Sequence, residues 1–436
     1  MVENTSPNSL NLGCSVTLTS LVTNESYDIT PMVHVAKMYE NIFIPFNTCE
    51  LLISDIGDIL NRYFLQGLEA VTITFTDITR LEEPYQKLFQ IILCEDVTYT
   101  SESIMFNRKV YKLYGVSLHK FIDSTKTVQK YYEETNTSSI VEDILTNYLL
   151  LPPDSLSIDT NTTQIKYTAP NLSPLNTINS LLKLSVSTEY TSSSYVCFEN
   201  ESGIHYKTVE QLIKEGRELL DTEEGQDQYT YTYTPTILDD NTESFFQSKI
   251  LQNFKQDKKY NIISMWETGA IAHNSIEYDI VNKEPVEINY KLGDYVDSFY
   301  KLENDPIILK EYLQNVATSN KTYVMYNGYK DTEPYNTGLQ EARSQKLAYF
   351  NMLQQNVFTC TVPAGTKIKA GDVLRVIIPE FASEILSTDK EEFRISGYFL
   401  VGDITREITE LNTGNSKFNS ILTLYKDSYN DAFATE

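Results

Sequence analysis

Apolar and polar residues alternate along much of the first quarter of the chain. Val71, Ile73 and Phe75 are separated by threonines, which gives a strand with one apolar and one polar face. We therefore predict that residues 12–115 form mainly strands, with a short helix or turn at 53–63. Two further segments in this region have strand composition and are separated by a polar stretch at 101–103, namely 88–99 and 104–116.

The spacing of apolar residues becomes helical after about residue 120. Ser139 and Glu142 have the spacing of a capping box, and the apolar residues that follow recur at helical intervals until Pro152. Two more helices are predicted to start at Ser173 and Thr208, each with a favourable capping residue. Residues 120–220 are therefore expected to form a mixed block that differs from the strands before it.

Tyrosine alternates with threonine at 228–235, which predicts a strand with one face made of Tyr229, Tyr231 and Tyr233. The whole chain contains 31 tyrosines and 1 tryptophan. Tyrosine and threonine both favour strands, and tyrosine suits half-buried surfaces with one apolar and one wet side. The composition therefore supports a β-rich protein.

The remaining pattern predicts helices followed by a β-rich end. A helix is expected to carry Phe246, Ile250 and Phe254, and residues 260–330 have the composition of strands and loops. A further helix is predicted at 341–355. The last block consists of strand segments with glycines at the turns between them, namely 358–362, 373–378, 393–408 and 418–425.

The charge of the chain disfavours binding to the phosphate backbone of nucleic acid. Lysine and arginine together number 35 and aspartate and glutamate 60, so the formal net charge is -25. A chain of this charge repels nucleic acid unless it has a concentrated basic patch, and no long run of basic residues is present. Two readings stay open: the charge keeps the protein soluble, or it forms an acidic wall past which a polyanion moves without sticking.

The cysteines and the N-terminus indicate a reduced environment. Five cysteines lie far apart without a CxxC pair, and we expect reduced, mostly buried thiols. Residues 1–10 are polar and lack the basic start and apolar stretch of a secretory signal. No apolar stretch approaches the length of a transmembrane helix.

No residue is assigned a catalytic, cofactor-binding or metal-binding role. The four histidines, His34, His119, His205 and His273, lack metal-chelating spacing, and each is expected to be a structural or surface residue. The sequence motifs of serine hydrolases, P-loop NTPases and dinucleotide-binding folds are absent. Residues that a fold brings together from distant positions escape such a search.

Acidic residues form several pairs, which matters because glycosidases use two carboxylates. Adjacent residues seldom flank a bond in the required geometry, so solvated loop charges are the favoured interpretation. The acids at 221–227 lack the ligand intervals and the distal glutamate of a calcium-binding EF-hand loop, so this segment is expected to be a linker. The pairs are Glu82 with Glu83, Glu133 with Glu134, Glu223 with Glu224, and Asp239 with Asp240.

Four segments together carry a family resemblance. The first three are 29–35 leading into 40–55, the strand 69–75, and the segment 195–206, which reads YVCFENESGIHY. The fourth is C-terminal and contains VPAG at 362–365, KAGDV at 369–373, SGYFLV at 396–401 and LYKDS at 424–428. In this order they resemble the baseplate hub family of contractile phage tails, which also covers the N-terminal part of type VI secretion spike proteins.

The resemblance implies a mainly β fold with α+β insertions, made of two tail-tube-like β-barrel domains plus mixed α/β domains. A length of 436 residues agrees with this, because it exceeds what one hydrophobic core supports. The last block, from about Phe358, is expected to fold back onto the second barrel and close it. The expected domains are a first tube-like barrel at 1–118, a mixed α/β domain at 119–222, a second tube-like barrel at 223–260 and 331–436, and a β-rich insertion at 261–330.

The same resemblance implies a structural hub in the virion's tail baseplate, assembled in the cytoplasm of the bacterial host, and not an enzyme. Three copies would place six similar barrels in a ring, which matches a sixfold tail tube above and a threefold central spike below. The implied partners are two further copies of the chain, the tail tube protein, the central spike protein and the surrounding baseplate wedge proteins. DNA would pass through the channel without specific binding, and neither a cofactor nor membrane insertion is expected.

Two other functions remain open on the sequence. The excess of carboxylates would suit a cell-wall hydrolase associated with the hub, which a lytic assay on peptidoglycan would reveal. The many tyrosines would suit a peripheral host-binding tail protein, since tyrosine is favoured in recognition surfaces. The position of the protein on the tail axis or at its periphery separates the hub from the host-binding protein.

Overall fold

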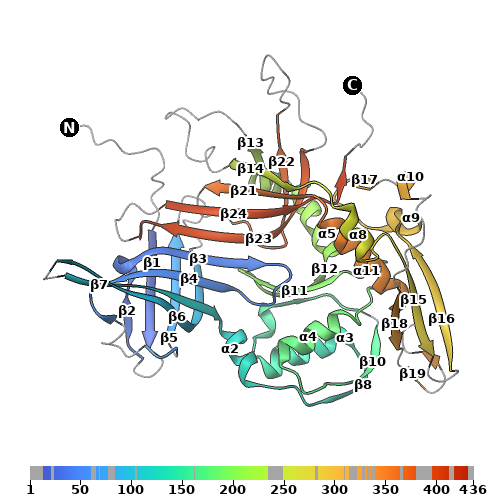
Figure 1. The fold of residues 1–436 in the computed structure, drawn as a ribbon, viewed down its shortest axis with the longest axis horizontal. Coiled ribbons are helices and arrows are strands. Elements are labelled where there is room, and N and C mark those ends of the chain that lie inside the picture. The colour runs from blue at the N-terminus through green and yellow to red at the C-terminus, as the bar shows by residue number, and fades with distance from the viewer. Residues whose placement is uncertain are drawn as a thin grey trace.

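The structure is a computed structural model, in which strands dominate (Figure 1). The mainly β fold with mixed insertions that the sequence predicted is confirmed. The structure describes residues 13–20, 24–59, 65–67, 69–76, 84–103, 106–161, 163–233, 249–279, 283–308, 310–313, 322–326, 329–330, 333–334, 339–363, 367–379, 395–411 and 417–430.

Seven antiparallel strands near the N-terminus form one sheet, called here the N-terminal sheet. They pair in the order β2-β1-β5-β6-β7-β4-β3. The alternation of Val71, Ile73 and Phe75 with threonine is confirmed as a strand, because all three apolar side chains are fully buried. The strands are β1 (Gly13–Ser20), β2 (Ser26–Asp28), β3 (Val33–Asn41), β4 (Thr48–Asp55), β5 (Glu69–Thr76), β6 (Tyr85–Ser103) and β7 (Phe106–Ser117).

Two local predictions in this sheet need correction. The polar stretch 101–103 belongs to β6, because the pairing of β6 with β7 continues to Ser103. The helix or turn predicted at 53–63 begins inside β4, which ends at Asp55. Residues 60–63 of that prediction lie outside the described residues.

Six strands from the second half close into a barrel, called here the closed barrel. Their order is β23-β22-β13-β14-β21-β24, and β24 pairs back onto β23. The prediction that the C-terminal block closes a barrel is therefore confirmed. The strands are β13 (Thr230–Tyr233), β14 (Ile250–Lys258), β21 (Val357–Pro363), β22 (Val373–Ile377), β23 (Gly397–Thr409) and β24 (Lys417–Tyr425).

Strand β23 belongs to both bodies. One of its edges pairs with β24, while the other pairs first with β22 and then, from Asp403 to Thr409, with β3 of the N-terminal sheet. The backbone turns before β22 and at the start of β23 are formed by Gly371 and Gly397. Their φ angles of 94° and 124° are ones that glycine adopts more readily than other residues. The ring of Phe418 on β24 lies 4.6 Å from that of Phe75 on β5, so side chains also join the bodies.

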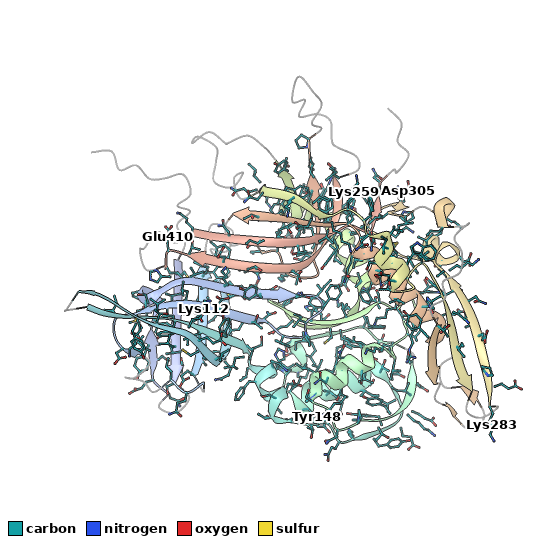
Figure 2. The ribbon with its side chains drawn as sticks, in the orientation of Figure 1. Lys112, Tyr148, Lys259, Lys283, Asp305 and Glu410 are labelled. Atoms are coloured by element: carbon teal, nitrogen blue, oxygen red, sulfur yellow. The ribbon has the colours of Figure 1, made fainter. Side chains whose placement is uncertain are left out.

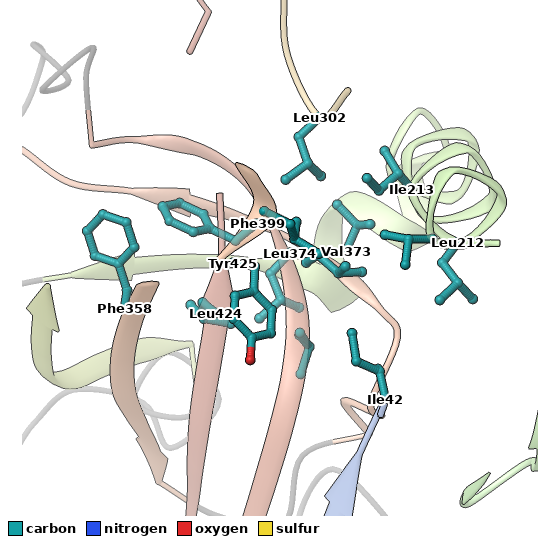
Figure 3. Close-up of a cluster of buried hydrophobic side chains, with 14 of the residues drawn as sticks. Ile42, Leu212, Ile213, Leu302, Phe358, Val373, Leu374, Phe399, Leu424 and Tyr425 are labelled. Carbon is teal, nitrogen blue, oxygen red and sulfur yellow. The ribbon is translucent and has the colours of Figure 1, made fainter. Parts of the chain in front are cut away.

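Three hydrophobic cores underlie this arrangement. The largest fills the closed barrel and continues beneath the helices at 209–220 and 339–353. In Figure 3, Phe358, Phe399 and Leu424 lie on the barrel side of Val373, and Leu212 and Ile213 lie on its other side. The second lies within the N-terminal sheet and includes Ile408 and Phe418 from the C-terminal strands. The third lies in the mixed block. A core that draws on both ends of the chain forms only when the C-terminal strands are in place.

The mixed block lies below the two β bodies in Figure 1. Its helices bury the apolar positions that the sequence predicted, including Val141, Ile144 and Leu145. The elements are α2 (Leu118–Thr125), β8 (Tyr131–Asn136), α3 (Thr137–Asp143), a π-helical segment η2 (Ile144–Tyr148), η3 (Pro153–Ser155), β9 (Leu156–Ile158), β10 (Gln164–Thr168), α4 (Pro174–Leu182), β11 (Tyr195–Asn200), β12 (Gly203–Thr208) and α5 (Val209–Leu220).

Three helix starts in this block were predicted, and two are confirmed. Helix α4 has Ser173 as its N-cap residue, and α5 has Thr208, whose side chain accepts a hydrogen bond from the Gln211 backbone. The capping box at Ser139 is wrong, because α3 starts at Thr137 after the N-cap residue Asn136. Strand β8 ends at Asn136 and runs directly into the helix, so the N-cap residue lies three positions before the predicted one.

The remaining elements are a mixed sheet, which lies at the right of Figure 1, and short segments from several parts of the chain. Strands β16, β15 and β18 make the sheet, and the helix predicted at 341–355 is confirmed as α11. The elements are η1 (Thr30–Met32), α6 (Glu223–Tyr229), α8 (Ile262–Glu267), β15 (Ala272–Asp279), β16 (Glu284–Lys291), α9 (Leu292–Tyr295), η4 (Val296–Ser298), β17 (Asp305–Pro306), α10 (Lys310–Leu313), β18 (Thr322–Tyr326), β19 (Tyr329–Lys330), β20 (Glu333–Pro334), α11 (Leu339–Leu353) and β25 (Ser428–Tyr429).

Three predictions between residues 221 and 254 need correction. The segment 221–227 is not a linker, because Thr222 caps helix α6 and its side chain accepts from the Gly225 backbone. Tyr229 ends that helix, so the tyrosine strand starts at Thr230, two residues later than predicted. Ile250 and Phe254 lie in β14, where pairing with β21 overrides their helical spacing, and Phe246 lies outside the described residues.

Candidate functional site

An ion pair is buried where the N-terminal sheet meets the closed barrel. Glu40 on β3 and Arg406 on β23 form it, with exposures of 2% and 0%. Arg406 also donates from Nη2 to the Ile368 carbonyl oxygen at 2.6 Å, and the Ala370 backbone donates to Glu40 at 3.3 Å. A buried pair of this kind contributes little net stability, but losing one partner is costly. It therefore specifies how β3, β23 and the segment before β22 fit together.

A second buried carboxylate joins the mixed block to the N-terminal sheet. Glu199 on β11 binds Lys87 of β6 at 2.6 Å and accepts a hydrogen bond from the Asn47 backbone at 2.8 Å. Ser117 also donates to Glu199, and the His119 ring nitrogen lies 3.9 Å from it. Burial alone would raise the pKa of Glu199, but these neighbours hold it below its ordinary value. The carboxylate therefore stays charged and holds three elements.

Two segments that carried the family resemblance meet in space. Gly371, in the segment before β22, packs so closely on Phe198 of β11 that an added Cβ would lie 2.8 Å from the ring. Nearby, the Asn200 side chain donates to the Ala370 carbonyl oxygen at 3.1 Å. The glycine is therefore required both for its positive φ angle and for this contact.

The LYKDS segment at the end of β24 anchors the insertion that follows α9. Lys426 and Glu303 form a buried ion pair at 2.7 Å. Asp427 accepts a hydrogen bond from the Leu302 backbone at 3.1 Å, and Ser428 accepts one from the Glu303 backbone at 2.7 Å. Burial raises the pKa of both carboxylates and lowers that of Lys426. These contacts attach residues 302–306 to the closed barrel.

A third group of buried polar residues lies between α5 and α11. Ser194 donates a hydrogen bond to Glu210, which is fully buried in the first turn of α5. Lys346 of α11 donates to the Leu182 and Tyr195 carbonyl oxygens at 2.8 and 3.1 Å. Burial raises the pKa of Glu210 to about 7 and lowers that of Lys346 to about 7. Lys346 is itself partly exposed, and its hydrogen bonds attach α11 to the end of α4 and the start of β11.

Glu210→Gln is expected to stabilise the protein at pH 8 and to leave its stability nearly unchanged at pH 4. The folded-state pKa of Glu210 is raised, so its stabilising contribution is lost as pH rises from about 4.5 to about 7. The amide oxygen of the glutamine still accepts the hydrogen bond from Ser194, but the side chain carries no charge. Removing the buried charge is expected to raise the free energy of unfolding by at most about 3 kcal/mol at pH 8. Thermal melts at both pH values measure this.

Glu218→Gln is the matched control for that experiment. Glu218 lies on the same helix but is exposed, so the melting temperature should be the same as that of the wild type at both pH values. A Glu210→Gln protein that is less stable than the wild type at pH 8 would contradict the assigned buried charge.

The histidines are placed individually. His119 contacts the Pro45 carbonyl oxygen at 2.8 Å, and His205 stacks on Phe198. His273 is buried and contacts the Gly269 carbonyl oxygen and the Ser344 hydroxyl, both at 2.8 Å. Within the described ranges no three His, Cys, Asp or Glu residues are grouped as metal ligands.

The cysteines and two of the acid pairs are placed as follows. All five cysteines are free, and three of them, Cys49, Cys197 and Cys360, are buried. Of the acid pairs, Glu82 with Glu83 and Asp239 with Asp240 lie outside the described residues. No helix in the described part of the chain combines the length and apolar character that a membrane span requires.

Sequence reasoning missed the buried charges. The two members of each pair are far apart in the chain: Glu40 and Arg406 are 366 positions apart, and Glu303 and Lys426 are 123 positions apart. The available signal was the LYKDS and KAGDV segments, in which charged residues directly border apolar strands. No interface residue was assigned from the sequence, and these contacts are all internal to one chain.

Comparison with known proteins identifies the fold. No family model and no curated protein matches the sequence. A tail protein from Neisseria meningitidis has a similar structure, with a TM-score of 0.53 and 10% identity, over 95% of this chain and 97% of that chain. A chain of the lidded Francisella PdpA-VgrG complex is similar with a TM-score of 0.50 and 9% identity, over 98% of this chain and 55% of that one. The chain therefore shares the fold of a tail protein, as the resemblance predicted.

Proposed function

We propose that this chain is the structural hub of a phage-type tail baseplate, a trimeric adaptor between a sixfold tail tube and a threefold central spike. The observation that carries the proposal is the tail-protein fold over nearly the full length of the chain and of its structural neighbour. Two β bodies in one chain give six in a trimer, which reconciles the two symmetries. The expected location is the baseplate of the virion, with wedge proteins around the hub.

The internal charges support a rigid structural role. Glu40, Arg406, Glu199 and Lys426 each connect elements from different parts of the chain. Buried charges at such junctions favour one arrangement of the two bodies over others, because any other arrangement leaves a charge unpaired. A hub needs this property, since a ring of six bodies closes only if the angle between the N-terminal sheet and the closed barrel of each chain is fixed. We accordingly propose that the chain acts without catalysis or cofactor.

The division into domains is part of the proposal. The first tube-like domain at 1–118 would correspond to the N-terminal sheet, and the mixed domain at 119–222 to the third core. The second tube-like domain at 223–260 and 331–436 would correspond to the closed barrel, interrupted by the insertion at 261–330. Because β23 pairs with both bodies, limited proteolysis is expected to leave the two barrels associated.

The mass of the purified protein in solution tests the proposal. A trimer of the chain, or a trimer formed when the tail tube or spike protein is added, is the expected result. Electron microscopy of the tail should then place the protein on the tail axis. Location only at peripheral fibres would favour the host-binding function instead, and lysis of peptidoglycan by the purified chain would favour the hydrolase.

The isolated protein is expected not to retain DNA. With a net charge of -25, each copy repels the duplex, and we propose that acidic side chains line the channel so that DNA moves through without being held. Binding at low salt should be weaker than about 0.1 mM, the weak end of non-specific DNA binding. Tight binding in a filter or fluorescence assay at low salt would contradict an acidic channel.

A further inference from the structure

The most exposed apolar strand of the described chain lies at the free edge of the N-terminal sheet. Strand β6 pairs with β5 only as far as Gln90, whereas its pairing with β7 continues to Ser103. Among the described strands, none pairs with the β5-facing edge of β6 beyond that point. We call residues 91–99 the β6 edge, and Figure 1 shows this part of the hairpin extending at the left of the molecule.

The β6 edge is apolar although water reaches it from both sides. Every residue from Ile92 to Tyr99 is exposed, and Tyr99 is 73% exposed. Five of the exposed large apolar side chains lie on this one strand, namely Leu88, Ile92, Leu93, Val97 and Tyr99. Long apolar edges without cover are aggregation sites, and soluble proteins rarely keep large apolar patches without a binding partner. We therefore expect the assembled protein to cover this strand.

Two bulges limit how the β6 edge can be covered. The register with β7 shifts between Ile91 and Leu93 and again between Glu95 and Thr98. Bulges interrupt regular pairing, so a long strand added in register is disfavoured. We therefore expect a partner to bind the β6 edge through its side chains. The bulges also limit open-ended strand pairing between copies.

A second exposed apolar group lies on the other body. Tyr260 and Ile263 are 73% and 67% exposed, and Ile262 lies between them at the start of α8, directly after barrel strand β14. Residues 258–263, called here the α8 corner, also contain Lys258 and Lys259. In Figure 2, Lys112 of the β6–β7 hairpin lies at the left and Lys259 to the right of centre.

The charges of the two surfaces are complementary. The β6 edge carries the exposed Glu95 and also Asp96, which forms an ion pair at 2.9 Å with Lys112 of the same hairpin, whereas the α8 corner carries Lys258 and Lys259. A chain with a net charge of -25 repels its own copies, so association requires a local pairing of opposite charges around apolar contacts. The β6 edge and the α8 corner supply the opposite charges and the apolar side chains.

We infer that the β6 edge of one copy docks on the α8 corner of the next copy. The contact is head-to-tail, joining the N-terminal sheet of one chain to the barrel side of its neighbour. Contacts between two different surfaces generate a ring when the rotation closes, and three copies then alternate the two bodies around the axis. The inference rests on the proposed trimeric hub and names the surfaces that would form it.

A cross-linking experiment tests the contact because the β6 edge already contains a thiol. Cys94 is free and exposed, so Ile263→Cys places a second exposed thiol on the α8 corner. A short bismaleimide should then cross-link the full-length protein into covalent trimers, without a series of longer products. Two control variants lack one of the two thiols, namely Ile263→Cys combined with Cys94→Ser, and Ile263→Ser. Both should give no cross-linked product and should remain trimers by mass.

Charge reversal provides an independent measurement. Glu95→Lys with Asp96→Lys is expected to reduce the trimer fraction at least tenfold, and adding Lys258→Glu with Lys259→Glu should restore it. Each reversed site is at least partly exposed, and the Lys112–Asp96 pair that is lost is a surface pair, so melting temperatures should change little. Recovery in the fourfold variant distinguishes a direct contact from a general effect of charge.

The outcomes separate this contact from the proposed function. A trimer by mass that gives no Cys94-dependent product, and that survives charge reversal, overturns the contact and leaves the hub intact. A protein that stays monomeric with and without tube and spike proteins, and gives no product, overturns both. A series of products longer than three supports the contact but contradicts a closed trimer.

Discussion

Removal of residues 417–436 is expected to give insoluble protein. The deletion takes away β24, which pairs with β21 on one side and β23 on the other and so closes the barrel. It also removes Leu422 and Leu424 from the largest core and Phe418 from the core of the N-terminal sheet. Each buried leucine alone is worth about 2–5 kcal/mol, so the loss exceeds the stability of an ordinary domain. Expression followed by separation of soluble and insoluble fractions measures it.

A shorter truncation is the matched control. Ending the chain after Asn430 keeps β24, β25 and the contacts of Lys426, Asp427 and Ser428. That protein is expected to stay soluble and to melt cooperatively. Should the protein without residues 417–436 also be soluble and melt cooperatively, closure of the barrel by β24 would not be needed for folding.

Arg406→Met is expected to destabilise the protein by about 3–5 kcal/mol, the cost of leaving one partner of a buried ion pair uncompensated. The substitution keeps much of the side-chain volume but leaves the Glu40 carboxylate without its partner. It also removes the hydrogen bond to the Ile368 carbonyl oxygen and the contact with the Tyr85 ring, 5.2 Å away. Denaturant unfolding measures the loss.

The same two strands offer a control pair. Lys37 on β3 and Glu407 on β23 face each other in register and form an ion pair at 2.9 Å, but both are partly exposed. Lys37→Met is therefore expected to cost at most about 1 kcal/mol. Combining Arg406→Met with Glu40→Leu should recover part of the loss, because no buried charge is then left alone. Equal effects at the buried and exposed pairs would contradict this explanation.

The sequence predicted helices best where their ends carried local signals. Ser173 and Thr208 cap α4 and α5 as expected, since a capping residue acts on backbone groups of its own first turn. The prediction failed for Ile250 and Phe254, whose helical spacing was overridden by pairing in the closed barrel. The start of the tyrosine strand was also two residues wrong and the N-cap residue of α3 three residues wrong, because neighbouring strands and helices compete for the same residues.

By itself, the sequence determined the β-rich character of the chain, the mixed block and the C-terminal run of strand segments. Alternation and turn residues act over a few positions, so these features can be inferred without the rest of the chain. The tertiary structure alone decided that β23 belongs to both bodies and that Arg406 meets Glu40. It also decided that the β6 edge stays uncovered in one chain. Such contacts join residues hundreds of positions apart, and no local pattern of apolar and polar residues specifies which distant partner is chosen.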